Sequence, residues 1–328
     1  MVNRSLTGRR AWVTGGLGFI GSNLALGLLR LGAEVTIVDP CVEGCGGNPA
    51  NLEPHLGHCR IVGRDIADAE TFASELATAD LVFNLAGEIS HSRSQREPMR
   101  DLELNTISQL RFLQVLARVR PGVRVVYAGT RQVYGRAHAL PVNEDHPIRP
   151  TDYNGVHKRA AENYHLMLSR IGVLDAVVLR LTNTYGPRLA LQLPGQGFLS
   201  AFLRRALNGE RIEVFGDGSQ LRDPVHVDDV TDAFIRAALA ESPPDRVFNV
   251  GGPEALTLLE IARLASLAAG SAGSITCREF PAEHLAFDIG SYQADITRIR
   301  AQLGWAPTIE FAVGIRATLN WFEKKLAA

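Results

Sequence analysis

The stretch Ala11-Trp-Val-Thr-Gly-Gly-Leu-Gly-Phe-Ile-Gly21 decides the fold of this chain of 328 residues. An apolar run leads into glycines at positions 15, 18 and 21, and an apolar helical pattern over residues 19–31 follows. In a nucleotide-binding turn, the first glycine permits the tight bend, the second lets the backbone approach a pyrophosphate, and the third lets the helix pack on the sheet. The phosphates then lie at the helix N-terminus, where free N–H groups favour negative charge. The stretch therefore predicts a dinucleotide site; a tight turn without a ligand is the alternative.

Asp39 indicates which dinucleotide this site would bind. It ends a second predicted strand, residues 34–38, at the distance from Gly21 where an acidic side chain accepts hydrogen bonds from the adenosine ribose. A 2′-phosphate would be repelled by the carboxylate, and no Arg or Lys occurs between Val35 and Asn51 to receive one. The sequence therefore predicts NAD rather than NADP.

Composition excludes several other kinds of protein. The 34 basic residues nearly balance the 35 acidic ones, so no global field favours nucleic acid. The N-terminus lacks the apolar region of a signal peptide, and no segment has the uninterrupted apolar length of a membrane helix. The four cysteines have no paired ligand spacing. We expect a cytoplasmic protein with no metal, nucleic-acid or membrane partner.

Strand-like and helix-like segments alternate through the first 180 residues, which is typical of right-handed βαβ units. The predicted strands are residues 11–14, 34–38, 59–62, 81–85, 124–128 and 176–180. The predicted helices are residues 19–31, 69–77, 101–119 and 152–171. We predict the α/β class, with a Rossmann-type doubly wound parallel sheet.

From residue 185 onward the alternation loosens and indicates a smaller mixed α/β lobe. We predict two interleaved domains. The NAD-binding domain comprises residues 1–183 plus about 223–251, and the substrate lobe comprises about 184–222 plus 252–328.

Residues that follow the predicted strands complete the expected cofactor site. Small residues, Ala86 and Gly87, follow Leu85 at the end of the fourth strand, where open α/β sheets bind ligands. Asp65 and Ile66 follow the third strand, where they would meet an adenine edge; a helix cap is the alternative for Asp65. The expected cofactor contacts so far are Gly15, Gly18, Phe19, Ile20, Gly21, Asp39, Asp65, Ile66, Leu85, Ala86 and Gly87.

Further motifs give the chain a family resemblance. They are Thr14-Gly-Gly-Leu-Gly-Phe-Ile-Gly21, Asn84-Leu-Ala-Gly87, Ala128-Gly-Thr-Arg-Gln-Val-Tyr-Gly135, Arg180-Leu-Thr-Asn-Thr-Tyr-Gly-Pro-Arg188, Leu221-Arg-Asp-Pro-Val-His-Val-Asp-Asp229 and Ala294-Asp-Ile-Thr-Arg-Ile-Arg-Ala-Gln-Leu-Gly-Trp305. Together they resemble the extended short-chain dehydrogenase/reductases, specifically the NAD-dependent epimerase/dehydratase family typified by UDP-glucose 4-epimerase. The resemblance implies bound NAD and a nucleotide-diphosphate sugar held between two lobes.

The family oxidises a sugar hydroxyl with a Ser or Thr, a Tyr and a Lys. The tyrosine takes the hydroxyl proton, and nearby positive charge lowers its pKa toward neutrality. Thr130 matches the hydroxyl position, and Lys158, which would also contact the cofactor, matches the lysine through its trailing Lys-x-Ala-Ala-Glu.

The tyrosine position departs from the family pattern. Asn154 stands four residues before Lys158, and Tyr153 stands five before it. Helix positions four apart differ by about 40° around the axis and positions five apart by about 140°, so Tyr153 would point away from Lys158. Either an irregularity at Gly155 re-aims Tyr153, or Asn154 takes the position and another base serves, or oxidation is weak and the protein mainly binds ligands. We take Thr130, Tyr153 and Lys158 as the expected catalytic set.

Four other side chains are candidates if another base serves. They are Glu88, His91, Tyr134 and His157, all near matched motifs, and the sequence favours none of them.

The resemblance also implies substrate contacts. Asn183 and Arg222 match positions that bind the diphosphate, and a guanidinium suits that group. Val214 matches a segment beside the nucleotide base, and Tyr292 would line the sugar or phosphate end.

Residues after Thr130 bear on the reaction. Family dehydratases and decarboxylases commonly carry a carboxylate there, whereas this chain has Arg131 and Gln132, which would instead bind a polar substituent of an unusual sugar. We therefore expect an NAD-dependent nucleotide-sugar epimerase that forms a transient keto-sugar and reduces it again. The alternatives are a dehydratase or 2-epimerase of the same family, or a catalytically impaired binding protein. The helices at 101–119 and 152–171 are expected to form a homodimer contact.

Overall fold

The computed structural model describes residues 5–193, 195, 197–271, 273–281, 285 and 287–327. One lobe is built on a seven-stranded sheet in the order β11-β6-β5-β4-β1-β2-β3, with every neighbouring pair parallel. Its strands are β1 (Arg10–Thr14), β2 (Glu34–Val38), β3 (Cys59–Val62), β4 (Leu81–Asn84), β5 (Arg124–Thr130), β6 (Asp175–Leu181) and β11 (Val247–Val250). This is the predicted Rossmann-type α/β fold.

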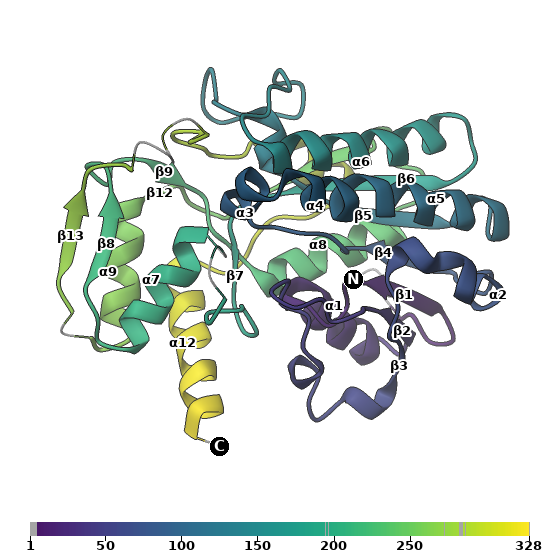
Figure 1. Ribbon diagram of the computed structural model, residues 1–328, viewed down its shortest axis with the longest axis horizontal. Coiled ribbons are helices and arrows are strands. Elements are labelled where there is room, and N and C mark those ends of the chain that lie inside the picture. Colours follow the sequence, from purple (N-terminus) through teal and green to yellow (C-terminus); the bar gives the residue numbers. More distant parts are fainter. Residues whose placement is uncertain are drawn as a thin grey trace.

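Helices cover both faces of the sheet (Figure 1). They are α1 (Phe19–Arg30), α2 (Ala73–Leu76), α3 (His91–Arg96), α4 (Pro98–Leu102), α5 (Ser108–Val119), α6 (Tyr153–Arg170), α8 (Val227–Leu239) and α11 (Thr297–Leu303). One face packs around Leu24, Val13 and Phe234, and the other around Phe112 and Val125, all of them buried. Both faces are covered, so the central strands are apolar almost throughout.

Two predicted helices differ from the observed ones. The segment expected at 69–77 is a 3₁₀ helix, Ile66–Phe72, followed by one turn of α-helix. The helix expected at 101–119 is α4, then a π-helical turn, Glu103–Ile107, and then α5. Apolar spacing predicts that these residues are helical, but it does not distinguish the hydrogen-bond patterns of the three helix types.

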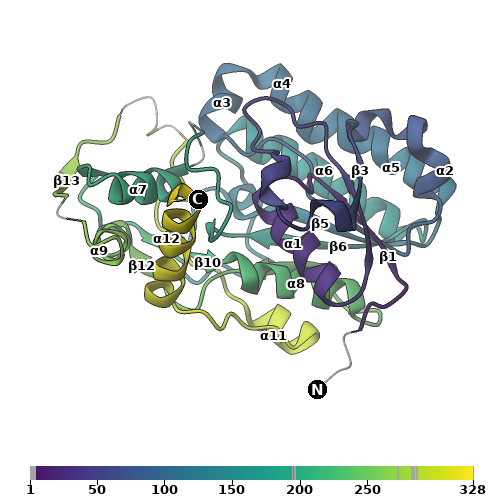
Figure 2. The same ribbon diagram turned by 90° about the horizontal axis from the view of Figure 1, so that it is seen from below.

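The second lobe lies to the left of the lobe that carries the sheet in both views (Figures 1 and 2). Its elements are β7 (Thr184–Tyr185), α7 (Gly197–Leu207), β8 (Ile212–Phe215), β9 (Leu221–Arg222), β10 (Val225–His226), β12 (Leu256–Thr257), α9 (Leu258–Ala268), β13 (Ile275–Arg278) and α12 (Phe311–Ala327). Phe202, Ile261 and Phe311 belong to its separate apolar core. The domain boundaries given above stay a prediction. Across the described ranges, no helix is both long and apolar enough to span a membrane.

The sheet topology positions the site. Connections from β1 run outward to β2 and β3, whereas β4, β5 and β6 continue in the opposite direction. Ligands of open α/β sheets bind at such a reversal, beyond the carboxyl ends of the strands. The glycine-rich turn follows β1, and the Leu85–Gly87 segment follows the adjacent β4.

Candidate active site

The turn between β1 and α1 follows its close path only because its glycines lack side chains. Gly15 has a φ of +65°, and a Cβ on it would lie 2.9 Å from the carbonyl oxygen of Leu85. A Cβ on Gly21 would lie 2.2 Å from the carbonyl oxygen of Gly15. Gly18 is the N-cap of α1 and no side chain caps it, which leaves N–H groups of the first turn available to a phosphate.

A cavity of about 320 Å³ extends from this turn along the carboxyl ends of the strands. Every residue expected to contact the cofactor lines it, together with Thr130, Asn154 and Asn183. The structure thus brings together residues between positions 15 and 183 that the sequence analysis assigned to one site.

Asp39 has the surroundings expected of a ribose-binding carboxylate. Its two oxygens accept hydrogen bonds from the backbone N–H groups of Leu17, at 3.0 Å, and Cys41, at 2.9 Å. These bonds hold the side chain at the cavity wall, and burial raises the pKa of its carboxyl. Asp65 caps the 3₁₀ helix through the N–H of Ala67, as the alternative interpretation held, and also lines the cavity. The glycine turn, the free helix terminus and the wall carboxylate together fit NAD.

Lys158 lies on α6, and its ammonium group reaches the same cavity. The residue is 6% exposed, and burial lowers its pKa to about 8. Its Nζ lies 5.8 Å from the ring centroid of Tyr127, and no residue of the described ranges hydrogen-bonds it. Lys158 is therefore a buried cation that is available to a ligand.

Asn154, and not Tyr153, stands beside Lys158 in the cavity wall. Helix α6 begins at Tyr153 without an irregularity at Gly155, so helical geometry turns Tyr153 outward. Tyr153 is 47% exposed and stacks on His157, whereas Asn154 is 2% exposed and lines the cavity. The structure therefore does not support the interpretation in which Gly155 re-aims Tyr153 toward Lys158.

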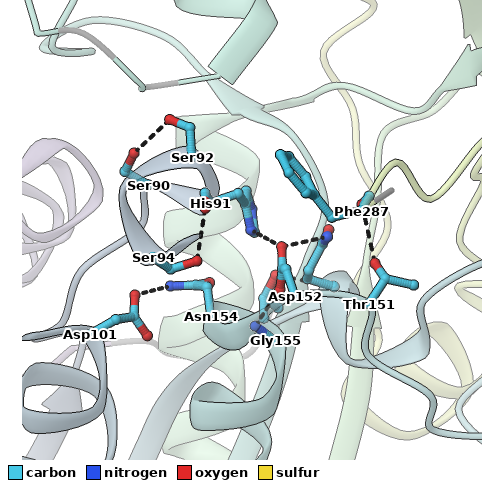
Figure 3. A network of polar contacts seen from close by, with 12 residues as sticks. Ser90, His91, Ser92, Ser94, Asp101, Thr151, Asp152, Asn154, Gly155 and Phe287 are labelled. Carbon is cyan, nitrogen blue, oxygen red and sulfur yellow. Dashed lines mark hydrogen bonds and ion pairs between the residues drawn. The ribbon is translucent and has the colours of Figure 1, made fainter. Parts of the chain in front are cut away.

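Partners on two other segments orient the amide of Asn154. Its Nδ2 donates to the carbonyl oxygen of Glu88 at 3.0 Å. It also donates to Oδ2 of Asp101 at 3.0 Å (Figure 3). A carbonyl oxygen and a carboxylate oxygen can only accept hydrogen bonds, so the atom of the Asn154 amide that faces them is its nitrogen. Asn154 Oδ1 accepts no hydrogen bond from the described residues. An amide oxygen can orient a hydroxyl group but cannot take its proton.

A second polar group lies at the start of α6. Asp152 caps the helix: its Oδ1 accepts from the N–H of Gly155 at 2.6 Å. Its Oδ2 lies 2.7 Å from Nδ1 of His91 and 2.9 Å from Nε2 of Gln132 (Figure 3). The side chain of His91 is 40% exposed and lines the cavity. Nothing in the sequence indicates that His91 pairs with Asp152, so the motifs alone leave His91 as one of four candidate bases.

The substrate candidates form a cluster behind Asn183. Arg131 Nη2 donates to Asn183 Oδ1 at 3.0 Å, and its guanidinium lies over the ring of Tyr292. Arg222 Nη1 donates to the carbonyl oxygens of Leu221 and Gly290. Burial and the neighbouring charge of Arg131 lower the pKa of Arg222. Buried nitrogens of both arginines and the hydroxyl of Tyr292 have no hydrogen-bond partner among the described residues, so the cluster suits an anionic ligand.

Val214 does not belong to this cluster. It is fully buried on β8 in the apolar core of the second lobe. Its side chain is therefore unavailable to a nucleotide base, contrary to the expectation from the family pattern. The alternation of apolar residues in a strand tells which residues share a face, but not which face is covered.

Asp223, beside the arginine cluster, predicts a pH dependence of stability. Burial raises its pKa from 3.8 to about 7. Folding thus favours the protonated form of Asp223. The stability that this carboxyl contributes is fully present below pH 3.8 and is lost as the pH rises through about 7. Asp223→Asn is expected to unfold at the same temperature as wild type at pH 4 and at a higher temperature at pH 8. Thermal unfolding at both pH values measures this; equal melting temperatures at pH 8 would contradict it.

The fold and the cavity define an NAD-binding enzyme of the Rossmann type, with a threonine and a lysine in the cavity wall and a cluster of buried arginines behind Asn183. Residues 11–251 match the NAD dependent epimerase/dehydratase family. The chain belongs to this family, and NAD is its cofactor.

Particular relatives span almost the whole chain. A UDP-glucose 4-epimerase of Mycolicibacterium smegmatis is 36% identical over 96% of this chain and 99% of its own length. A dTDP-glucose 4,6-dehydratase of Streptomyces niveus is 32% identical over 97% of this chain and 94% of its own. The structure of UDP-glucose 4-epimerase with UDP-glucose from Thermotoga maritima superposes with a TM-score of 0.87 at 30% identity, covering 97% of this chain and 99% of that one. Relatives of this similarity thus include both epimerases and dehydratases.

Proposed function

We propose that the protein is an NAD-dependent nucleotide-sugar epimerase that oxidises its substrate to a 4-keto-sugar and reduces it again on the other face. The observation that carries this proposal is that Thr130, Lys158 and Asn183 line one cavity with the glycine turn. A hydroxyl, a cation and a diphosphate contact thus surround the place where a sugar would meet the cofactor.

Each residue has a separate role in the proposal. NAD, when bound, supplies a reversible hydride acceptor. Lys158 holds the cofactor and contributes positive charge, and Thr130 hydrogen-bonds the reacting oxygen. Asn183, with Arg131 and Arg222 behind it, binds the diphosphate. Tyr292, which supports the Arg131 guanidinium, completes this end of the site.

The residues after Thr130 support epimerisation over elimination of water. Elimination needs a group that carries a proton to or from the sugar ring, and family dehydratases commonly supply it as a carboxylate here. In this chain Arg131 is committed to Asn183, and Gln132 donates to Asp152. Neither side chain can act as that acid or base.

Turnover of a substrate panel tests the proposal. The purified protein is incubated with UDP-, dTDP-, GDP- and CDP-sugars, and the products are followed by NMR. We expect inversion at one ring carbon without loss of water. Loss of water with solvent deuterium at C5 would replace the epimerase by a dehydratase, and no conversion of any sugar would contradict both.

Asn154 in the tyrosine position favours a second candidate function, a protein that binds NAD and a nucleotide sugar without oxidising it. Absorbance at 340 nm separates the two functions, because a binder forms no NADH. Appearance of NADH on addition of any sugar of the panel would exclude the binder.

We also propose that the enzyme is a homodimer through α6. Exposed side chains of Tyr153, Val156 and Met167 share one face of this helix. Sedimentation velocity at micromolar concentration would show a dimer; a monomer would contradict this contact.

A further inference from the structure

We infer that His91, held by Asp152, is the general base that takes the proton of the sugar hydroxyl. This inference rests on the proposed function, since it names the base for that oxidation. It is needed because Asn154, which stands in the tyrosine position, cannot accept a proton at neutral pH. Both hydrogens of its amide are donated to protein oxygens, so Asn154 can only orient the hydroxyl through Oδ1.

Asp152 sets the tautomer of His91. The side chain of Asp152 is fully buried, and hydrogen bonds from His91, Gly155 and Gln132 lower the pKa of its carboxyl against the opposing effect of burial. A carboxylate accepts hydrogen bonds only, so Nδ1 of His91 carries the hydrogen in their 2.7 Å contact. In the neutral ring Nε2 therefore keeps its lone pair, which is the form that a base requires.

The backbone around His91 holds the ring at the cavity. His91 is the first residue of α3, and Ser90 caps that helix by accepting from the N–H of Arg93 at 3.2 Å. Ser94 Oγ donates to the carbonyl oxygen of His91 at 2.7 Å (Figure 3). Nε2 of His91 makes no hydrogen bond to a described residue. His91 thus has one nitrogen fixed in the protein and the other available to a ligand.

The other candidate bases are engaged elsewhere. Glu88 accepts from the N–H groups of Ile89 and Ser90 with one oxygen and from Arg93 with the other. Nδ1 of His157 contacts Asp101 at 2.7 Å, and His157 does not line the cavity.

Tyr134 is unsuitable for a different reason. Its hydroxyl donates to Asn249 and accepts from Arg180, and burial raises its pKa to about 12. Among the four candidates from the sequence, only His91 combines a place in the cavity wall with an unengaged basic nitrogen.

The proton and electron balance of the step is complete. The O–H bond of the sugar breaks and its proton moves to His91 Nε2. The electron pair of that bond forms the carbonyl, while the C–H hydride leaves the same carbon for the cofactor. When the hydride returns to the opposite face, the imidazolium gives the proton back to the oxygen. His91 and the cofactor therefore end as they began, as an isomerisation requires.

Variants of His91 and Asp152 test the inference, and a variant of an exposed histidine is the matched control. His91→Gln removes the base at similar size. Asp152→Asn keeps a good helix N-cap but removes the carboxylate that sets the tautomer. His58→Gln changes an exposed histidine that does not line the cavity. The rate of NADH formation within the first turnover is measured at 340 nm with the sugar that the panel identifies.

We expect His91→Gln to lower this rate 10²- to 10⁴-fold, the usual contribution of a general base, with nucleotide-sugar affinity changed less than about threefold. Free imidazole should restore part of the rate to His91→Gly. The control is expected to keep the wild-type rate. Long-range ¹H–¹⁵N spectra of the unliganded protein give a readout besides activity. His91 should carry its hydrogen on Nδ1 in wild type and on Nε2 in Asp152→Asn, because the amide nitrogen that replaces Oδ2 donates to Nδ1.

Three results would overturn the inference. If wild type forms NADH and His91→Gln forms it equally fast, the inference fails and the proposed function stands. If Tyr153→Phe alone loses the rate, Tyr153 is the base. If wild type converts no sugar of the panel, the proposed function fails and the inference fails with it.

Discussion

Lys158→Met is expected to lower the rate of NADH formation about 10³-fold without unfolding the protein, because it removes the cation that holds and polarises the reacting groups. The chain has three lysines, and the other two, Lys324 and Lys325, lie within its last five residues. The Nζ of Lys158 has no hydrogen-bond partner in the described part of the chain and lines the cofactor cavity. We also expect the dissociation constant for NAD to rise about tenfold, which corresponds to about 1.4 kcal/mol.

The pKa of Lys158 indicates that the loss of rate in Lys158→Met does not come from unfolding. The pKa of the folded state, about 8, lies below the unfolded value of 10.5, so protonation opposes folding. The stability associated with the neutral form is fully present above pH 10.5 and is lost as pH falls toward 8. Unliganded Lys158→Met should therefore be at least as stable as wild type at pH 7. Denaturant unfolding measures the stability, and calorimetry measures the affinity for NAD.

Lys324→Met is the matched control, because Lys324 is exposed on α12. It is expected to keep the wild-type rate and affinity. A Lys158→Met protein with the full rate of NADH formation would show that the buried cation has no part in the reaction.

Glu162→Ala is expected to reduce the free energy of unfolding by about 3–5 kcal/mol, the cost of leaving a buried charge without its partner. Glu162 is fully buried on α6, and its oxygens accept from Nε and Nη2 of Arg180 on β6, at 3.1 and 2.6 Å. Arg180 is 3% exposed, and its bonds to Glu162 and Tyr134 raise its pKa against the effect of burial. Urea unfolding measures the loss.

Two further variants show whether the buried charge is the cause. Glu70→Ala removes an exposed ion pair with Arg118 and is expected to cost less than about 1 kcal/mol. The double variant Glu162→Leu with Arg180→Met replaces both charges by apolar groups and should recover most of the stability. A double variant as unstable as Glu162→Ala would instead indicate lost packing.

Local patterns in the sequence were sufficient for the fold and for part of the site. The glycine turn at 15–21 and the alternation of strands and helices predicted the parallel sheet, and Thr130 and Lys158 were found through their motifs. Helical geometry alone also indicated that Tyr153 points away from Lys158. What remained open was whether Gly155 breaks the helix, and Asp152 decides this by capping a regular first turn.

The sequence by itself determined the class of fold, the cofactor and the absence of a tyrosine four residues before Lys158, because each depends on residues close together in the chain. Only the tertiary structure paired His91 with Asp152, 61 positions apart, and Arg131 with Asn183, 52 positions apart. It also buried Val214 in the second core. The physical reason is that a helix or strand period orders neighbouring side chains, whereas contacts between distant segments depend on how their elements pack.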